Sequence, residues 1–251
     1  MKIVAVTQAR FGSSRLPGKI LKKINGETLL SIHLKRALQS NLIDKLIVAT
    51  TDEPESDEIC AIARHTGASC YKGSMDDVLD RFYQAVKNEK ANFIVRITSD
   101  CPLIDPELMD DVIRFTINNK LDYCTNALSE TFPDGVDVEV FTFNALEIAW
   151  KEAKMNSERE HVTPFIWKNS SIKNGSRFKS EHFRYEKDYS KIRITVDEEA
   201  DLILLEKLVS TLGSDKPWLD YADYILAHPD LMALNSKAIR NEGYRKSLEN
   251  D

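Results

Sequence analysis

The stretch IVAVTQARFGSSRLPGK, from Ile3 to Lys19, decides the fold. Its first five residues form an apolar, mostly β-branched run, which predicts a central strand buried on both faces. The residues that follow contain two glycines and three cations, Arg10, Arg15 and Lys19. Glycines let backbone N–H groups approach a polyphosphate, and ligands of open α/β sheets bind at strand ends. The stretch therefore predicts an anion-binding loop directly after a buried strand.

Strands and helices alternate along the first half of the chain. Apolar runs at 46–50 and 93–97 resemble the first strand, and helix-period stretches at 29–40, 55–66 and 77–86 separate the three runs. This alternation is typical of parallel βαβ units, with helices on both faces of the sheet. We expect an α/β fold with a mainly parallel, doubly wound central sheet.

The pattern changes after the first half. Asp105 before Pro106 predicts a helix N-terminus, with the helix running to about residue 118. Pro133-Asp134-Gly135 predicts a turn, and residues 136–140 alternate apolar with acidic, as a half-exposed strand does. We expect this strand in a sheet extension or small lobe spanning about 123–190.

The C-terminal part predicts one more strand and helix. Residues 192–196 form an apolar run that predicts a last strand, and the acids at 197–199 begin a helix to about 212. Residues 235–251 are mostly polar and are expected to fray. The main domain is therefore expected to span 1–234, followed by a polar tail over 235–251.

Bulk composition excludes several classes of protein. The 251 residues hold 40 acidic and 34 basic side chains, a net charge of −6 that gives no broad positive field for nucleic acid or anionic membrane. The four cysteines form neither a C-x-x-C pair nor a zinc-ligand pattern, so we expect reduced thiols. The apolar run at the N-terminus is too short to cross a membrane. We expect a cytoplasmic protein that is not inserted into a membrane.

Two common phosphate-binding motifs do not fit the loop. A P-loop has four residues between its glycines and Ser or Thr after the lysine, whereas five residues separate Gly12 from Gly18 and Ile20 follows Lys19. The G-x-G-x-x-G dinucleotide motif is absent. Kinase, GTPase and dehydrogenase functions therefore lose their main support. The alternative that involves no ligand is a solvated basic turn.

Two aspartates follow other predicted strands. Asp100 comes after the 93–97 run, and Asp197 comes after the 192–196 run. Mg²⁺ in nucleotide sites takes one or two carboxylates together with substrate phosphates, so both residues are candidate metal ligands. Each also has a structural alternative, since Asp100 could cap a turn and Asp197 could be a helix N-cap.

Together these segments resemble the cytidylyltransferases that activate 3-deoxy-manno-octulosonate and acylneuraminates, and more closely their spore-coat polysaccharide (SpsF-like) relatives. The family loop Arg-x-x-Ser-x-Arg-Leu-Pro-Gly-Lys corresponds to Arg10–Lys19 without a break. Its Asp-x-Pro-Leu motif corresponds to 100–103, and its Asp-x-x-x-Asp-Leu turn corresponds to 197–202. The resemblance covers roughly residues 1–212 and implies a nucleotide-diphospho-sugar transferase-like Rossmannoid fold.

The resemblance also implies a reaction and a set of residues. CTP and a sugar acid would give a CMP-sugar and pyrophosphate in a Mg²⁺-dependent reaction, for surface polysaccharide biosynthesis. Arg10, Lys19 and Asp100 would be catalytic, and Asp100 and Asp197 would bind the metal. The implied nucleotide contacts are Ala9, Arg10, Gly12, Ser13, Arg15, Lys19, Ser74, Arg81 and Thr98. The implied sugar contacts are Asp134, Glu139, Arg159 and His161.

Several points stay open at the level of sequence. Thr98-Ser99-Asp100-Cys101-Pro102 replaces the Gln-Gly-Asp-Glu-Pro of the octulosonate enzymes, and Leu79-Asp80-Arg81 replaces Gly-Thr-Asp-Arg, so the sugar is not fixed. Arg81 could be an exposed helical cation, His161 could be structural, and no general base stands out. Alternative functions are a glycosyltransferase with a nucleotide-sugar donor and a non-catalytic nucleotide-binding homologue.

The family resemblance also implies a homodimer. Relatives pair through the region corresponding to 133–167, where aromatic side chains are frequent. We expect the apolar contact, or otherwise ordinary core, from Phe141, Phe143, Trp150, Phe165 and Trp167.

Overall fold

The computed structural model describes residues 1–13, 15–249 and 251. Ser14 of the glycine-containing loop and Asn250 of the expected tail lie outside the described residues. The strands are β1 (Ile3–Gln8), β2 (Lys23–Ile24), β3 (Glu27–Thr28), β4 (Lys45–Thr51), β5 (Ser69–Gly73), β6 (Phe93–Thr98), β7 (Tyr123–Thr125), β8 (Glu139–Thr142) and β9 (Ser180–His182). Short 3-10 helices cover Lys19–Leu21 and Ser171–Lys173.

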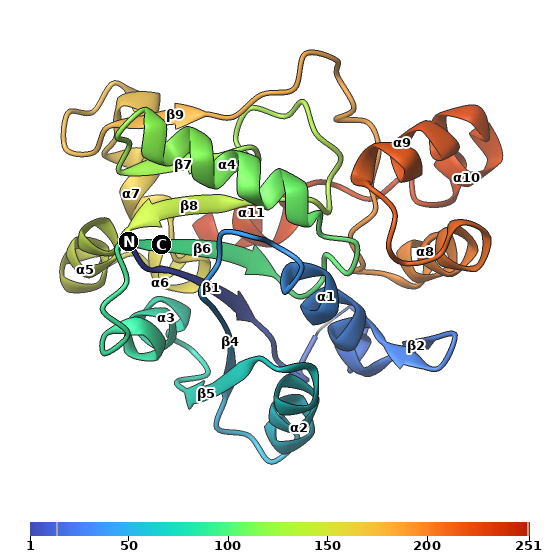
Figure 1. The fold of residues 1–251 in the computed structure, drawn as a ribbon, viewed down its shortest axis with the longest axis horizontal. Helices are drawn as coiled ribbons and strands as arrows, with labels where there is room; N and C mark the ends of the chain where they lie inside the picture. Colours follow the sequence, from blue (N-terminus) through green and yellow to red (C-terminus); the bar gives the residue numbers. More distant parts are fainter. Residues whose placement is uncertain (14, 250) are drawn as a thin grey trace.

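The helices cover both faces of the sheet and continue to the C-terminus (Figure 1). They are α1 (Leu29–Ala37), α2 (Ser56–Thr66), α3 (Val78–Val86), α4 (Pro106–Asn118), α5 (Phe143–Glu152), α6 (Asn156–His161), α7 (Pro164–Lys168), α8 (Glu199–Leu212), α9 (Trp218–Ala227), α10 (Pro229–Leu234) and α11 (Glu242–Leu248). The predicted starts of α3 and α4 are confirmed, since Asp77 and Asp105 cap them through their side chains.

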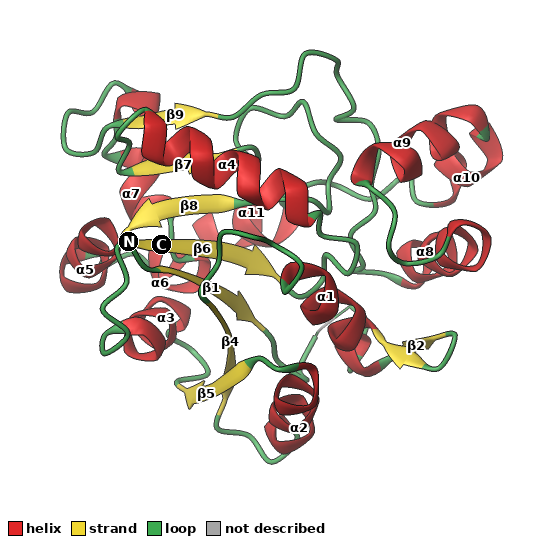
Figure 2. Cartoon of the chain, viewed as in Figure 1, coloured by secondary structure: helices red, strands yellow, loops and turns green. Residues whose placement is uncertain are grey.

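One sheet organises the molecule, in the order β5-β4-β1-β6-β8-β7-β9 (Figure 2). The strands β5, β4, β1 and β6 are parallel, and β8 is antiparallel to both of its neighbours. The predicted α/β fold with a mainly parallel sheet is confirmed. The chain between 123 and 190 adds β7, β8 and β9 to this same sheet, which agrees with the sheet-extension alternative.

The two faces of the sheet carry separate apolar cores. On β1, Ile3 and Ala5 pack on the face with α1 and α4, whereas Val4 and Val6 pack on the face with α3 and α5. Successive side chains of a strand point to opposite faces, so an apolar run without alternation is what a strand covered on both sides requires. The interpretation of β1, β4 and β6 as buried strands is confirmed.

Two strand expectations were wrong. Val136–Val140 was expected to be half-exposed, yet Val136, Val138 and Val140 are fully buried and Glu139 is buried too, because β8 lies between β6 and β7. Residues 192–196 form no strand, since their β-bridging within the described part of the chain is limited to a single bridge between Arg193 and Asp134. Gly135 (φ +119°) allows this bridge, because an added Cβ would lie 2.4 Å from the backbone nitrogen of Thr195.

The cysteine expectation was wrong for two of the four thiols. Cys60 of α2 and Cys70 of β5 form a disulfide, whereas Cys101 and Cys124 are free and buried. Sequence spacing does not reveal this pair, because the ten-residue separation closes only when α2 packs beside β5. Among the described helices, none has the length and apolar character needed to cross a bilayer.

The aromatic residues expected at a dimer contact have different environments. Phe141 is fully buried in the core, so it is not available for a surface contact. Phe143, Trp150, Phe165 and Trp167 are partly buried, and Trp150 stacks on Tyr83 with ring centroids 4.0 Å apart. The environments of these four aromatic residues are those of ordinary core packing, and homodimer formation stays a prediction.

Candidate functional site

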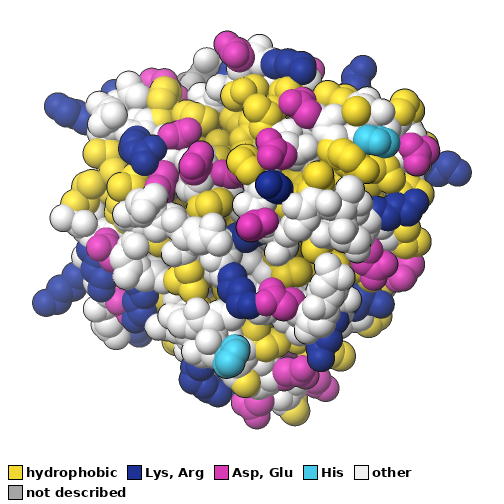
Figure 3. Space-filling model, turned by 45° about the vertical axis from the view of Figure 1, so that its right-hand side comes forward, with side chains coloured by type: hydrophobic (Ala, Val, Ile, Leu, Met, Phe, Trp, Pro, Cys, Tyr) yellow, Lys and Arg dark blue, Asp and Glu magenta, His cyan; other side chains and the backbone are white. Residues whose placement is uncertain are grey.

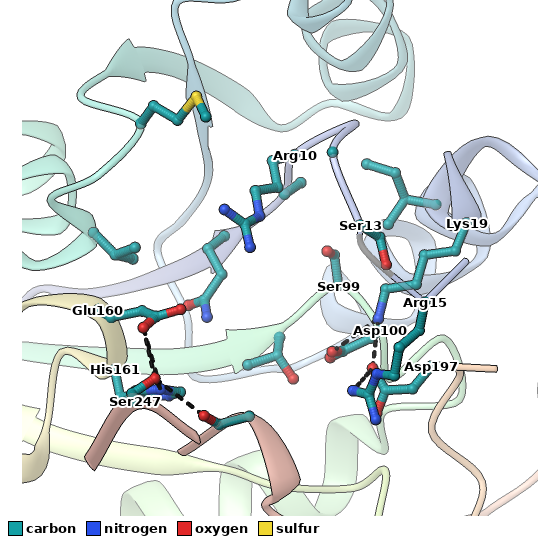
Figure 4. Close-up of a pocket in the computed structure, with 18 of the residues that line it drawn as sticks. Arg10, Ser13, Arg15, Lys19, Ser99, Asp100, Glu160, His161, Asp197 and Ser247 are labelled. Atoms are coloured by element: carbon teal, nitrogen blue, oxygen red, sulfur yellow. Dashed lines mark hydrogen bonds and ion pairs between the residues drawn. The ribbon is translucent and has the colours of Figure 1, made fainter. Parts of the chain in front are cut away.

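A cavity of about 580 Å³ lies at the C-terminal ends of β1 and β6. Parallel strands place their carboxyl ends at one edge, which is the edge where ligands of open α/β sheets bind. Its lining comes from distant parts of the chain: Gln8, Ala9, Arg10, Gly12, Ser13, Arg15, Lys19, Ile20, Met75, Asp76, Val78, Arg81, Thr98, Ser99, Asp100, Glu160, His161, Asp197, Glu242, Gly243, Lys246 and Ser247. We call residues 9–19 with Asp100 and Asp197 the loop side, and α6 with α11 the helix side (Figure 4).

The glycine-containing loop folds back on itself. The backbone N–H of Gly18 donates to the carbonyl of Phe11 at 3.0 Å, and that of Lys19 donates to the carbonyl of Leu16 at 3.1 Å. Gly18 adopts φ +64°, a left-handed conformation that favours glycine. This turn directs the side chain of Lys19 toward the cavity, where Arg10 also points (Figure 4). The loop therefore concentrates cations at the end of β1.

The two predicted metal carboxylates converge on Lys19. Its Nζ lies 3.3 Å from Oδ2 of Asp100 and 2.8 Å from Oδ1 of Asp197, and it donates to the carbonyl of Val196 at 2.8 Å. Burial works to lower the pKa of Lys19, but the two carboxylates outweigh it and raise this pKa above its usual value. Burial also works to raise the pKa of Asp100, yet Lys19 and Thr98 lower it to about 2. Both groups are therefore charged at neutral pH.

Asp197 is not the N-cap of α8, so the structural alternative for this residue was wrong. Glu198 is the N-cap and forms a capping box with Asp201. The carboxylate of Asp197 is held instead by Arg193, at 2.9 Å, and by Arg15, at 3.0 Å. Asp197 is therefore oriented toward the loop by residues on either side of it.

The residues at this point fit a divalent cation of the Mg²⁺ type. Two carboxylates face one position, which the Lys19 ammonium shares in this structure. No group of three or more His, Cys, Asp and Glu side chains that could hold a metal occurs among the described residues. Mg²⁺ needs only one or two protein carboxylates when substrate phosphates and waters complete its six ligands. Asp100 and Asp197 are the residues that would hold it.

The cavity includes most of the predicted nucleotide contacts. Ala9, Arg10, Gly12, Ser13, Arg15, Lys19, Arg81 and Thr98 all line it, whereas Ser74 does not. Arg81 is only 2% exposed, so its interpretation as an exposed cation was wrong. Burial, together with nearby Arg10, lowers the pKa of Arg81 to about 10. Ser74 lies beside the cavity, where its carbonyl accepts from Arg81 and its hydroxyl accepts from the N–H of Asp77.

Of the predicted sugar contacts, only His161 lines the cavity. Glu139 is buried beneath the sheet surface and is bonded to Arg96, Tyr123 and Thr163. The side chain of Glu139 therefore lies in the core and not at the cavity, because β8 lies between β6 and β7 in the sheet.

Asp134 and Arg159 also lie outside the cavity lining. Asp134 is 8% exposed and pairs with Arg193, which ties it to the segment before Asp197. Arg159 pairs with Asp77, the N-cap of α3, and donates to the carbonyl of Trp150. Both side chains have protein partners that hold neighbouring segments together.

The C-terminal segment was expected to be a fraying tail, which was wrong. Its residues form α11, which packs against α6 and supplies Glu242, Gly243, Lys246 and Ser247 to the cavity. Of the seven residues of α11 only Tyr244 and Leu248 are large and apolar, so one i, i+4 pair was too weak a sequence signal for this docking. Gln8, Ser99 and Glu160 were missed as well; Gln8 Oε1 is buried and has no hydrogen-bond partner among the described residues.

Positive and negative side chains are mixed on the face of the molecule that Figure 3 shows. Figure 3 shows lysine and arginine side chains interspersed with aspartates and glutamates, with apolar patches between them. This mixture of signs agrees with the net charge of −6.

Comparisons with known proteins place the chain in a family. A family model described as cytidylyltransferase matches residues 4–225. The chain is 38% identical to an uncharacterized protein of Methanocaldococcus jannaschii, MJ1063, over 99% of this chain and 100% of that protein. It is 33% identical to the spore coat polysaccharide biosynthesis protein SpsF of Bacillus subtilis, over 84% of this chain and 88% of that protein.

A solved structure agrees with both sequence comparisons. A cytidylyltransferase from Leptospira borgpetersenii superposes with a TM-score of 0.86 at 34% identity, covering 92% of this chain and 97% of that one. The family model spans most of the chain, including the loop, Asp100 and Asp197. The chain therefore belongs to the cytidylyltransferase family.

Proposed function

We propose that this chain is a Mg²⁺-dependent cytidylyltransferase that couples CTP to a sugar acid of the octulosonate or nonulosonate type, for surface polysaccharide biosynthesis. The observation that carries the proposal is the convergence of Asp100 and Asp197 on Lys19 Nζ at the cavity wall. A triphosphate bound by the loop cations would bring its own negative charge to this point. Family membership supports the nucleotidyl transfer, and the motif resemblance supports the acid class.

The proposed reaction is an in-line displacement at the α-phosphorus. A sugar hydroxyl forms the new P–O bond, the bond from the α-phosphorus to the bridging oxygen breaks, and pyrophosphate leaves with that electron pair. Lys19, Arg10 and Arg15 line the cavity as cations and offset the charge that accumulates on the leaving group. Bound Mg²⁺ supplies Lewis-acid polarisation of phosphate oxygens and would be held by Asp100 and Asp197.

Positioning accounts for much of the expected rate. The loop holds its cations through backbone hydrogen bonds, and Arg193 and Arg15 fix the orientation of Asp197. Groups that are already oriented need little rearrangement as charge develops, which lowers the barrier. The sugar hydroxyl loses its proton to water as the new P–O bond forms.

The proposal is tested by following pyrophosphate release. The protein is incubated with Mg²⁺, each of the four nucleoside triphosphates in turn, and a panel that includes 3-deoxy-manno-octulosonate and N-acetylneuraminate. We expect pyrophosphate with CTP and at least one acid, together with a CMP-sugar detected by mass spectrometry. Transfer from a nucleotide sugar with release of free CMP or UDP would point to a glycosyltransferase instead. Nucleotide binding without turnover would point to a non-catalytic homologue.

A further inference from the structure

The C-terminal helix α11 spans the cavity from one side to the other. Near its start, Glu242 accepts from Arg15 of the loop at 2.9 Å. Near its end, Ser247 contacts His161 and Glu160 of α6, and Asp251 then bonds Ser157 through its carboxylate. Residues 242 and 247 are about 8 Å apart along a helix, at 1.5 Å of rise per residue. The helix therefore bridges the phosphate-binding loop and α6.

At the α6 end, Ser247 joins a defined hydrogen-bond cluster. Its buried Oγ lies 2.6 Å from Glu160 Oε2, 3.0 Å from the carbonyl of Gly243 and 2.9 Å from His161 Nε2. The carboxylate and the carbonyl can only accept, so the serine proton goes to one of them and His161 Nε2–H donates to the serine oxygen. Ser247 thereby sets the orientation of Glu160 and the tautomer of His161.

The same helix places a cation at the cavity wall. Lys246 lines the cavity and pairs with Glu242 one turn earlier on α11, at 2.7 Å. The other lining cations, Arg10, Arg15, Lys19 and Arg81, come from the loop and from α3. Lys246 thus contributes positive charge from the opposite, C-terminal element, and α11 lies beyond the segment 4–225 matched by the family model.

We propose that α11 is the acceptor-binding wall of the site: Lys246 attracts the carboxylate of the sugar acid, and Ser247 positions Glu160 and His161 to bind its hydroxyls. This inference rests on the proposed function. The sugar substrate must lie next to the α-phosphate, and α11 is the element that joins the loop side to α6. The Glu160 carboxylate can accept hydrogen bonds from sugar hydroxyls, and the Lys246 ammonium can pair with the carboxylate of the sugar acid.

The test compares two neighbouring cations of α11. Lys246→Met removes the cation that lines the cavity, whereas Arg245→Met removes an exposed cation that does not line it. With the acid that the wild-type protein turns over fastest, we expect Lys246→Met to raise the acceptor KM about tenfold and Arg245→Met to leave it within about twofold. The Kd for Mg²⁺-CTP, measured by calorimetry, should stay unchanged in both variants.

A second pair of variants tests the positioning role of Ser247. Ser247→Ala should raise the acceptor KM, and Ser247→Thr, which keeps the hydroxyl, should restore it. The ¹⁵N NMR shifts of His161 should report an Nε2–H tautomer in the wild type and lose it in Ser247→Ala. A merely structural serine would lower the unfolding temperature without changing the tautomer.

Several outcomes would overturn the proposal. Equal losses of CTP affinity and acceptor affinity would assign α11 to the nucleotide, and an unchanged acceptor KM in Lys246→Met would remove Lys246 from the acceptor wall. To separate this inference from the proposed function, both acids are titrated into wild-type protein holding Mg²⁺ and α,β-methylene-CTP while the His161 resonance is followed. If acid binding shifts the His161 resonance but the separate assay with CTP releases no pyrophosphate, only the proposed reaction is contradicted. Binding that leaves His161 unchanged contradicts the role of α11, and failure of both acids to bind contradicts the acid class of the proposed function.

Discussion

The loop side and the helix side of the cavity face each other but differ in chemistry. On the loop side, cations and carboxylates are paired, with Lys19 between Asp100 and Asp197. On the helix side, Ser247, Glu160 and His161 form a hydrogen-bond cluster in which burial, followed by Arg96, lowers the pKa of His161 to about 4. Ion pairs can exchange partners with a charged ligand, whereas an oriented polar cluster distinguishes the shape of a sugar.

The two sides also differ in how they are encoded. The loop cations are contiguous in sequence, and two aspartates complete the group. The helix side joins residues 157–161 to residues 242–248 and Asp251, which come together only when α11 packs on α6. The comparison teaches that the loop side can be predicted from a motif, whereas the helix side depends on tertiary packing.

The largest effect should come from Asp100. Asp100→Asn removes the charge of a proposed metal ligand while keeping the shape of the side chain, and we expect pyrophosphate release to fall by about a hundredfold or more. The rate is measured with CTP, Mg²⁺ and a sugar acid. Asp111→Asn, at an exposed carboxylate of α4, is the matched control. Normal turnover in Asp100→Asn would remove this residue from the metal site.

Lys19 should compete with the metal for the two carboxylates. In Lys19→Met this ammonium is lost, so we expect Mn²⁺ to bind the nucleotide-free protein about tenfold more tightly, since cation and ammonium share one position. Electron paramagnetic resonance of free Mn²⁺ measures the affinity. Lys22→Met, at a partly exposed lysine nearby, is the control. Equal or weaker Mn²⁺ binding in Lys19→Met would show that the carboxylates do not form the cation site.

The helix side should add a pH-dependent contribution to stability. The folded pKa of His161 is about 4, below its usual 6.5, so the unfolded chain binds the extra proton between these values. Stability is therefore expected to fall as pH falls from 6.5 to 4, and His161→Gln should remove about one proton from this slope, while the buried His33, whose pKa is also lowered to about 4, keeps its own share. Denaturant unfolding at a series of pH values measures this slope. If the variant keeps the full wild-type slope, His161 is not buried as a neutral ring.

The smallest effect should come from the contact that joins the two sides. Glu242 is partly exposed and pairs with Arg15, so Glu242→Gln should change CTP affinity by no more than about fivefold. The sign should be tighter binding, because a negative charge near the phosphates is removed. Calorimetry at low and high salt measures the change, which salt should reduce. Weaker CTP binding in Glu242→Gln would mean that this pair orders the loop.

Much of the fold could be predicted because its signals are local. The runs that became β1, β4 and β6, and the caps Asp77 and Asp105, follow from periodicity and side-chain capping within a few residues. The run at 192–196 has a similar composition but forms no strand, because among the described residues its β-bridging is limited to one bridge, between Arg193 and Asp134. An apolar run predicts that a segment is buried, but the segment forms a strand only if an adjacent strand is available for backbone pairing.

By itself, the sequence determined the parallel α/β half, the cationic loop after the first strand and the two aspartates. These features follow from side-chain chemistry and from spacings of a few residues. Only the tertiary structure decided that Lys19 lies between the two carboxylates, that Glu139 is buried inside the sheet, and that α11 closes the helix side. Each of these contacts joins residues far apart in the chain, whose partners are fixed when whole elements pack together.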